Sequence, residues 1–239
     1  MANQDRERVT IVTGASGGLG AAVVTALDRT GAAVVAVGHR PGGIESAIEG
    51  FSSLARHLVI EGVDLASAAG SRQVIEAAVH NYGRIDALVN TIGGFRSDGP
   101  LQVSPVELLD EMMALNARTV YVMCQAVIPQ MLDQGTGRIV NVASRAGFTG
   151  SAGFAAFSAS KAAVLRLTES LSQEVKNQGI NVNCVIPGTM DTPENRKARP
   201  EASFDRWVSP TDVAKVILFL ISDDASAIHG ATLPVLGLT

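Results

Sequence analysis

The sequence predicts an α/β fold in which a doubly wound, seven-stranded parallel sheet carries helices on both faces. Two observations support this prediction. Short runs rich in β-branched residues alternate with helical patterns along the chain, and the runs are mostly apolar, as expected of strands buried on both faces. Strands joined through helices in this order require right-handed crossovers and therefore a mostly parallel sheet. Because no internal repeat or linker-like segment interrupts the pattern, we expect one domain over residues 1–239.

The expected strands begin near the N-terminus and recur at intervals that leave room for a helix. They are Val9–Thr13, Ala33–Val37, His57–Ile60, Ala87–Asn90, Arg138–Val142, Asn181–Ile186 and Thr232–Val235. The expected helices are Gly18–Thr30, Ser67–Tyr82, Val106–Leu132, Ala159–Gln178 and Thr211–Ile221, with a weaker one at 41–50. The polar stretch Pro193–Trp207 has no clear period, so we expect a long loop of the kind that covers a binding site.

Composition and charge exclude several classes of protein. With 46% apolar residues and a net charge of −4, the chain is typical of a globular protein that binds no nucleic acid. Its apolar runs are too short to span a membrane, and the polar segment Met1–Arg8 does not resemble a secretory signal. The four histidines lack metal-ligand spacing, so we expect no metal. Cys124 and Cys184 are expected to be buried thiols of a reduced, cytoplasmic protein.

A glycine-rich segment follows the first expected strand. It reads Thr13-Gly14-Ala15-Ser16-Gly17-Gly18-Leu19-Gly20 and leads into the alanine-rich start of a helix. Glycines let the backbone turn tightly and approach a pyrophosphate, while a helix N-terminus offers N–H groups and the positive end of its dipole to the phosphates. This strand–turn–helix context predicts a Rossmann-type dinucleotide site. The residues expected around the phosphates are Gly14, Ser16, Gly18, Leu19 and Gly20.

The spacing Thr-Gly-x-x-x-Gly-x-Gly resembles that of the short-chain dehydrogenase/reductase family, and the resemblance extends over essentially the whole chain. Further landmarks of that family follow the third, fourth and sixth expected strands: Asp64-Leu65, Asn90-Thr91-Ile92-Gly93 and Pro187-Gly188-Thr189-Met190-Asp191-Thr192. The resemblance implies that the first pair contacts adenine and that the last segment lies beside the nicotinamide. The cofactor-binding residues implied in this way are Asp64, Leu65, Asn90, Gly93, Pro187, Gly188, Met190 and Thr192. All of them lie beyond carboxyl ends of strands, where open α/β sheets bind ligands.

The end of the second expected strand bears on the choice of dinucleotide. An acidic residue there would bind the adenosine ribose and repel a 2′-phosphate. Gly38 stands where NAD-preferring members of the family usually carry aspartate, and Arg40, with His39 if protonated, could pair with the phosphate. The sequence therefore favours NADP(H). NAD stays open, because the glycine-rich segment lacks the basic residue expected of NADP binders and Arg40 can equally be a solvated surface residue.

The resemblance also implies a catalytic set from which one member is missing. In the family a tyrosine exchanges a proton with the substrate oxygen, a lysine four residues later lowers its pKa and binds the ribose, a serine polarises the substrate and an asparagine anchors a water. Lys161, Ser144 and Asn116 match the lysine, the serine and the asparagine, and Phe157 occupies the tyrosine position. Phenylalanine cannot titrate, and removing a general acid typically costs about 10²–10⁴ in rate.

Three hypotheses follow from Phe157. The protein is a reductase for substrates that need little acid help, such as an iminium or quinonoid acceptor. Alternatively, it is a dinucleotide-binding member with a non-redox or regulatory role, or it is a tyrosine-to-phenylalanine variant of a working reductase. The intact Lys161, Ser144 and Asn116 favour the first and third hypotheses.

We therefore expect NADP(H)-dependent hydride transfer to or from a small carbonyl, imine or quinonoid compound. Lys161 with a water, or Ser144, could then relay the proton. Tyr121, on the preceding expected helix, is expected to have a core or interface role instead.

The segment 191–210 resembles the corresponding stretch of dihydropteridine reductases and related bacterial short-chain reductases. In the family this region covers the substrate, so Phe204 and Trp207 are candidates for an apolar lid, the alternative being a surface loop pinned by its tryptophan. The resemblance also implies an assembly. The expected helices Val106–Leu132 and Ala159–Gln178 carry more apolar surface than one sheet face needs, and family members often pair these helices between subunits. We expect a homodimer or homotetramer, closed in part by the last strand and the tail 237–239.

Overall fold

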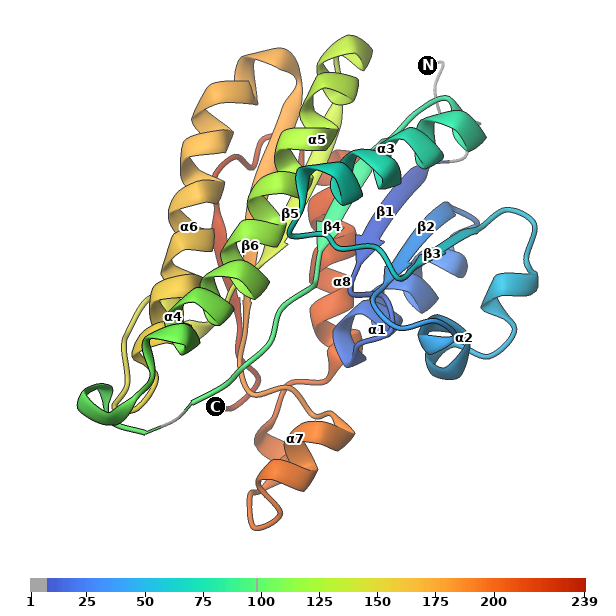
Figure 1. The fold of residues 1–239 in the computed structure, drawn as a ribbon. Coiled ribbons are helices and arrows are strands. Elements are labelled where there is room, and N and C mark those ends of the chain that lie inside the picture. The colour runs from blue at the N-terminus through green and yellow to red at the C-terminus, as the bar shows by residue number, and fades with distance from the viewer. Residues whose placement is uncertain (1–7, 98) are drawn as a thin grey trace.

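The computed structural model describes residues 8–97 and 99–239, and in this part of the chain seven strands form one parallel sheet (Figure 1). The strands are β1 (Val9–Thr13), β2 (Ala33–Gly38), β3 (Leu58–Glu61), β4 (Ala87–Asn90), β5 (Gly137–Val142), β6 (Ile180–Pro187) and β7 (Thr232–Val235). Their order is β3-β2-β1-β4-β5-β6-β7, and every pairing is parallel. The predicted doubly wound sheet is confirmed. The order reverses direction between β1 and β4, which is where such sheets bind their ligands.

Helices cover both faces of this sheet, because alternate residues of each strand point to opposite sides. Within β2, Val35 packs under helices α3 and α5, whereas Val34 packs under α1 and α8. The helices are α1 (Gly18–Asp28), α2 (Gly43–Ala47), α3 (Ala68–Tyr82), α4 (Val106–Met112), α5 (Thr119–Gln134), α6 (Ala155–Val175), α7 (Pro193–Ala198) and α8 (Pro210–Ile221). The two resulting cores hold the strand ends in place, and those ends carry the site.

Two of the expected helices differ from the structure in ways that affect the site. The helix expected at Val106–Leu132 is interrupted by a π-helical stretch, Met113–Arg118, between α4 and α5. Such stretches are rare and often occur at functional sites. The helix expected from Ala159 begins earlier, at Ala155, so Phe157 lies in its first turn rather than in a preceding loop.

The expectation of a long loop at Pro193–Trp207 was wrong in part. Residues Pro193–Ala198 form α7, and Phe204–Arg206 form a turn of 3₁₀ helix. The physical reason is a capped start: the Thr192 hydroxyl accepts a hydrogen bond from the Asn195 N–H at 3.3 Å, and a proline is favourable in the first turn. In Figure 1 α7 stands beyond the carboxyl ends of the strands, apart from the two helical layers.

Candidate active site

The glycine-rich segment forms a tight cradle between β1 and α1. A Cβ on Gly20 would lie 2.0 Å from the Gly14 carbonyl oxygen, and one on Gly14 would lie 2.9 Å from the Ile92 nitrogen. Gly14 also has a φ of +69°, which side-chain-bearing residues rarely adopt. The first turn of α1 contains no acidic residue, so its N–H groups and positive dipole end have no charged partner there. The cradle therefore fits a phosphate group.

Two residues outside the glycine-rich segment hold the cradle. The Thr91 hydroxyl donates a hydrogen bond of 2.6 Å to the Thr13 carbonyl and so ties the end of β4 to the end of β1. The Thr192 methyl group packs on Gly18, where a Cβ would approach it to 2.9 Å. The expected site residues after β1, β4 and β6 thus meet at one edge of the sheet. The segment Asn90-Thr91-Ile92-Gly93 does not by itself predict this role of Thr91, because the hydrogen bond depends on β1 and β4 being neighbours.

The loop after β2 presents His39 and Arg40 to solvent. Neither side chain forms an ion pair or hydrogen bond within residues 8–97 and 99–239, so both are open to a ligand. Gly38 is packed against Ile44, whose Cγ1 would lie 3.1 Å from a Cβ at that position. An aspartate at position 38 therefore requires Ile44 to move.

A carboxylate that sequence analysis missed lies beside this loop. Glu61, the last residue of β3, pairs with Gly38 in the sheet and accepts hydrogen bonds from the N–H groups of Gly42 at 2.7 Å and Ile44 at 2.8 Å. The signal that could have found it is the parallel register, which places the ends of β2 and β3 side by side. Both carboxylate oxygens of Glu61 therefore order the loop that carries Arg40.

The two predicted adenine contacts and Asn90 offer different groups to a ligand. Asp64 is exposed and accepts a hydrogen bond from the Ala66 N–H, whereas the Leu65 side chain is buried in the core and leaves its main chain for a ligand. Asn90 is fully buried and donates 2.9 Å to the Asn141 carboxamide oxygen. The Asn90 side chain therefore ties β4 to β5, and a contact of this residue with the cofactor stays a prediction.

Lys161 is buried beside Gly93. Its Nζ donates to the Val142 carbonyl at 3.3 Å, and burial lowers its pKa to about 8. A Cβ on Gly93 would lie 3.0 Å from this Nζ and 2.8 Å from Asn116 Oδ1. Any residue larger than glycine would therefore displace the lysine or the asparagine side chain. The predicted Lys161, Asn116 and Gly93 are thus brought together.

The Asn116 side chain is engaged by protein groups. Its Oδ1 accepts from the Gly94 N–H at 2.9 Å, and its Nδ2 donates to the Gly94 carbonyl at 3.1 Å and to Ser160 Oγ at 3.0 Å. Ser160 Oγ in turn donates to the Phe157 carbonyl at 2.8 Å. The Asn116 side chain therefore clamps the Gly94 backbone, and its role in anchoring a water stays a prediction. The π-helical stretch aims Asn116 inward to make that clamp.

Ser144 lies at the end of β5 and is half-buried. Its Oγ accepts from the Ala146 N–H at 3.3 Å, which leaves the hydroxyl proton available to a ligand. The short turn Arg145–Gly147 packs tightly on α6, since a Cβ on Gly147 would lie 2.9 Å from the Lys161 carbonyl carbon. The turn that follows Ser144 is thus packed against the main chain of α6 at Lys161.

Phe157 belongs to a cluster of three aromatic rings. The Phe95 ring centroid lies 5.0 Å from that of Phe157 and 5.0 Å from that of Phe154, with the rings nearly perpendicular in both pairs. Phe95 follows Gly93 and Gly94, so the cluster adjoins Lys161. Apolar rings therefore occupy the position at which the family has its hydroxyl.

Contacts among its own side chains stabilise the segment after β6. Asp191 forms an ion pair with Arg196, the Arg196 guanidinium lies 4.8 Å over the Phe204 ring, and Phe204 packs on Trp207 at 4.9 Å. Arg206 donates 2.8 Å to the Leu238 carbonyl and its carbonyl accepts from the Leu238 N–H at 2.9 Å. The two predicted lid residues thus form one unit that is tied to the tail.

Pro187, Gly188 and Met190 connect this unit to the sheet. Pro187 is the last residue of β6. Gly188 lies against the tail, where a Cβ would approach Thr239 Oγ1 to 2.5 Å, and Met190 forms an isolated bridge with Val208.

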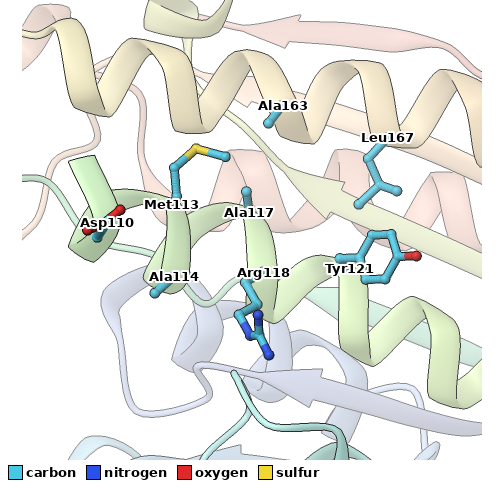
Figure 2. A pocket seen from close by; sticks show the side chains of 8 residues that line it. All are labelled: Asp110, Met113, Ala114, Ala117, Arg118, Tyr121, Ala163 and Leu167. Atoms are coloured by element: carbon cyan, nitrogen blue, oxygen red, sulfur yellow. The ribbon is translucent and has the colours of Figure 1, made fainter.

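A surface groove of about 520 Å³ lies on the outer side of α4, α5 and α6, and residues of all three helices and of the π-helical stretch line it. Figure 2 shows Met113, Ala117 and Tyr121 facing Ala163 and Leu167 across it. Leu167 is ten residues beyond Phe157 on α6, about 15 Å along the helix axis. Tyr121 therefore cannot stand in for the missing hydroxyl.

A family model described as short chain dehydrogenase matches residues 8–203. The chain is 36% identical to 2-(R)-hydroxypropyl-CoM dehydrogenase of Xanthobacter autotrophicus, over 95% of this chain and 96% of that protein. In the part of the chain that the structure describes, no helix is long and apolar enough to cross a membrane.

Three solved structures resemble nearly the whole chain. NAD+-bound xylitol dehydrogenase has a TM-score of 0.88 at 26% identity, over 98% of this chain and 100% of that one. ElxO with NADP bound has a TM-score of 0.89 at 25% identity, over 97% and 98%. A tyrosine-to-phenylalanine variant of ElxO with NADPH bound matches equally well, with a TM-score of 0.89 at 25% identity over 97% and 98%.

Proposed function

The chain belongs to the short-chain dehydrogenase family, and on that premise we propose that it is an NADP(H)-dependent oxidoreductase acting on a small carbonyl, imine or quinonoid compound. The proposal rests on a site that lacks one group, the hydroxyl at the position of Phe157. The cradle, Lys161, Ser144 and the Asn116 clamp lie at one edge of the sheet, around Phe157. A proton at the substrate must come from elsewhere, or the substrate must need none.

The residues present fit a nicotinamide dinucleotide. The cradle between Gly14 and Gly20 would hold the pyrophosphate, and Asp64 and the Leu65 main chain lie where the adenine contacts are expected. When bound, the dinucleotide supplies hydride exchange at its nicotinamide ring. We favour NADP(H) because the exposed Arg40 and His39 are open to a 2′-phosphate, and ElxO, which is similar over nearly its whole length, binds NADP.

The chain's own polar residues would orient the reactants. Lys161 Nζ, held beside Gly93, would bind the nicotinamide ribose, and the Ser144 hydroxyl would donate to the polar atom of the substrate. Lys161, with its lowered pKa of about 8, exchanges protons near neutral pH and can pass one through a water. The Asn116 side chain acts through Gly94 by fixing the backbone beside these groups.

The test is Phe157→Tyr, assayed beside the native chain on a carbonyl and on an imine. We expect carbonyl turnover to rise by about 10²–10⁴, because a titratable hydroxyl returns beside Lys161. Phe154→Tyr, at the residue just before α6, is the matched control and should not produce this rise. Equal and substantial carbonyl turnover in the native chain and in Phe157→Tyr would contradict the view that the site lacks its acid.

A second candidate function is dinucleotide binding without turnover, and Phe157 itself favours it. The ElxO variant that holds NADPH has phenylalanine in place of a tyrosine. Fluorescence titration with NADPH and NADH separates the candidates. Tight binding with no turnover on any substrate class supports the second candidate. Failure to bind either dinucleotide contradicts both.

We further propose that the chain assembles as a homodimer or homotetramer through the outer groove. The groove exposes Met113 and Tyr121 between α5 and α6, an apolar face that a second copy would bury. Tyr121→Glu should shift the mass measured by light scattering towards the monomer. An unchanged mass above that of the monomer would place the interface elsewhere.

A further inference from the structure

Phe95 is an aromatic residue whose side chain is largely exposed to solvent. Its side chain is 55% exposed, although it packs edge to face with both Phe154 and Phe157. Phe95 comes two residues after Gly93, and Phe157 comes four residues before Lys161. The rings therefore belong to residues that are near neighbours in the chain of Gly93 and Lys161, and the proposed function puts the reacting atoms beside these two residues.

Aromatic faces carry partial negative charge and attract cations, whereas they offer no hydrogen bond to a neutral carbonyl oxygen. The position that would place a hydroxyl beside a carbonyl oxygen holds Phe157 instead. A ketone must gain a proton when it is reduced, because hydride addition leaves an alkoxide. The ring cluster thus has no proton donor for a ketone, whereas its aromatic faces attract a cation.

We propose, building on the oxidoreductase function above, that the substrate accepted best is an iminium cation on a flat apolar ring, held against Phe95 and Phe157. Hydride adds to the iminium carbon and forms a C–H bond. The C=N π electrons become the nitrogen lone pair, the positive charge is lost, and NADPH is oxidised to NADP+. Charge and atoms balance without a proton, so the missing hydroxyl costs this reaction nothing.

The ligand loses its charge as it reacts. The amine formed has no charge at the moment of hydride transfer, so its attraction to the ring faces is weaker than that of the iminium cation. Phe95, on a loop whose backbone is clamped at Gly94 by Asn116, is the specificity-determining residue, because it has the most exposed ring of the three.

The experiment compares ligands that share one two-ring skeleton: N-methyl-3,4-dihydroisoquinolinium, which is a permanent cation, and 1-tetralone, which is its ketone counterpart. NADPH oxidation is followed with each, after subtracting the rate without protein. Calorimetric titration of each ligand into protein saturated with NADP+ adds a readout that does not depend on turnover. We expect kcat/KM at least about tenfold higher, and binding about 2–30-fold tighter, for the cation.

Two variants assign the preference to the rings. Phe95→Leu removes the ring and should weaken binding of the cation about 2–5-fold while leaving the ketone within about twofold. Phe95→Tyr keeps the aromatic face and is the control. Phe157→Tyr should raise ketone turnover and so lower the ratio of iminium to ketone kcat/KM, because only the ketone takes a proton.

Several outcomes would overturn the inference. One is native turnover of 1-tetralone as fast as that of the cation. A second is equal loss of affinity for both ligands in Phe95→Leu. If no ligand is turned over while NADPH still binds, the proposed oxidoreductase function fails. The calorimetric preference for the cation, and its dependence on Phe95, then still decides whether the rings form a cation site.

Discussion

The half of the site built by β1, α1 and β2 differs from the half built after β4, β5 and β6 in what forms the binding surface. In the first half the backbone itself is the surface, since the chain at Gly14 and Gly20 comes too close for any Cβ. In the second half side chains form it, and one of them is a phenylalanine where the family has a hydroxyl. Binding of a dinucleotide thus depends on shape along a whole segment, whereas proton chemistry depends on a single atom. One substitution can therefore alter the chemistry and leave the binding geometry intact.

The largest effect on the first half is expected from Gly20→Ala. The new Cβ would lie 2.0 Å from the Gly14 carbonyl oxygen, so α1 must move away from the cradle. We expect the Kd for NADPH to rise about 30–100-fold, equivalent to about 2–3 kcal/mol of overpacking. Fluorescence titration measures it. The control is Gly150→Ala, where a Cβ meets nothing within 4 Å. An unchanged Kd in Gly20→Ala would show that the cradle is not the phosphate site.

A stability measurement probes the second half through Lys161→Met. Burial lowers the folded-state pKa of Lys161 from 10.5 to about 8, so the unfolded chain binds more protons between these values and stability rises with pH across that window. At pH 7 the lysine is charged in both states and burial disfavours folding. We expect the variant without dinucleotide to gain about 1–3 kcal/mol in free energy of unfolding at pH 7 and less at pH 10.

Urea denaturation at both pH values checks this expectation. Lys176→Met, at an exposed lysine, is the control and should change stability by less than about 0.5 kcal/mol. A loss of stability in Lys161→Met at pH 7 would mean that its hydrogen bond to the Val142 carbonyl outweighs the burial of its charge.

The smallest expected effect concerns the choice of dinucleotide. Arg40→Ala should raise the KM for NADPH about tenfold and leave the KM for NADH within about twofold, because only NADPH carries the 2′-phosphate. Steady-state kinetics with both dinucleotides measures the split, and Arg29→Ala, exposed at the end of α1, is the control. A similar change for both dinucleotides would shift the assignment towards NAD and towards Glu61 as the acidic group near Gly38.

Much of the fold could be predicted from the sequence because its signals are local. The bounds of β1, β4 and β7 agree with the expected ranges, since β-branched runs end at polar residues or turns. The start of α6 at Ala155 was missed, because no capping side chain marks Phe154 as the residue before the helix. The α7 helix was missed because a stretch of six residues is too short to show a period.

The candidate site divides in the same way. The glycine-rich segment, Lys161, Ser144 and Phe157 could be found from the sequence because their spacing along the chain is itself the signal. Glu61 beside the β2–α2 loop, the Asn116 clamp and the engagement of Asn90 inside the sheet could not, because each depends on which strands are neighbours.

By itself the sequence determined the order of strands and helices, the phosphate cradle and the absence of a titratable group at position 157. Only the tertiary structure decided that Phe95, some sixty residues away along the chain, packs on Phe157. The two rings form an aromatic surface at the position where the family has its hydroxyl. The physical reason is that hydrogen bonding and periodicity act between near neighbours in the chain, whereas ring packing depends on how the ends of parallel strands and the helices that follow them are brought together.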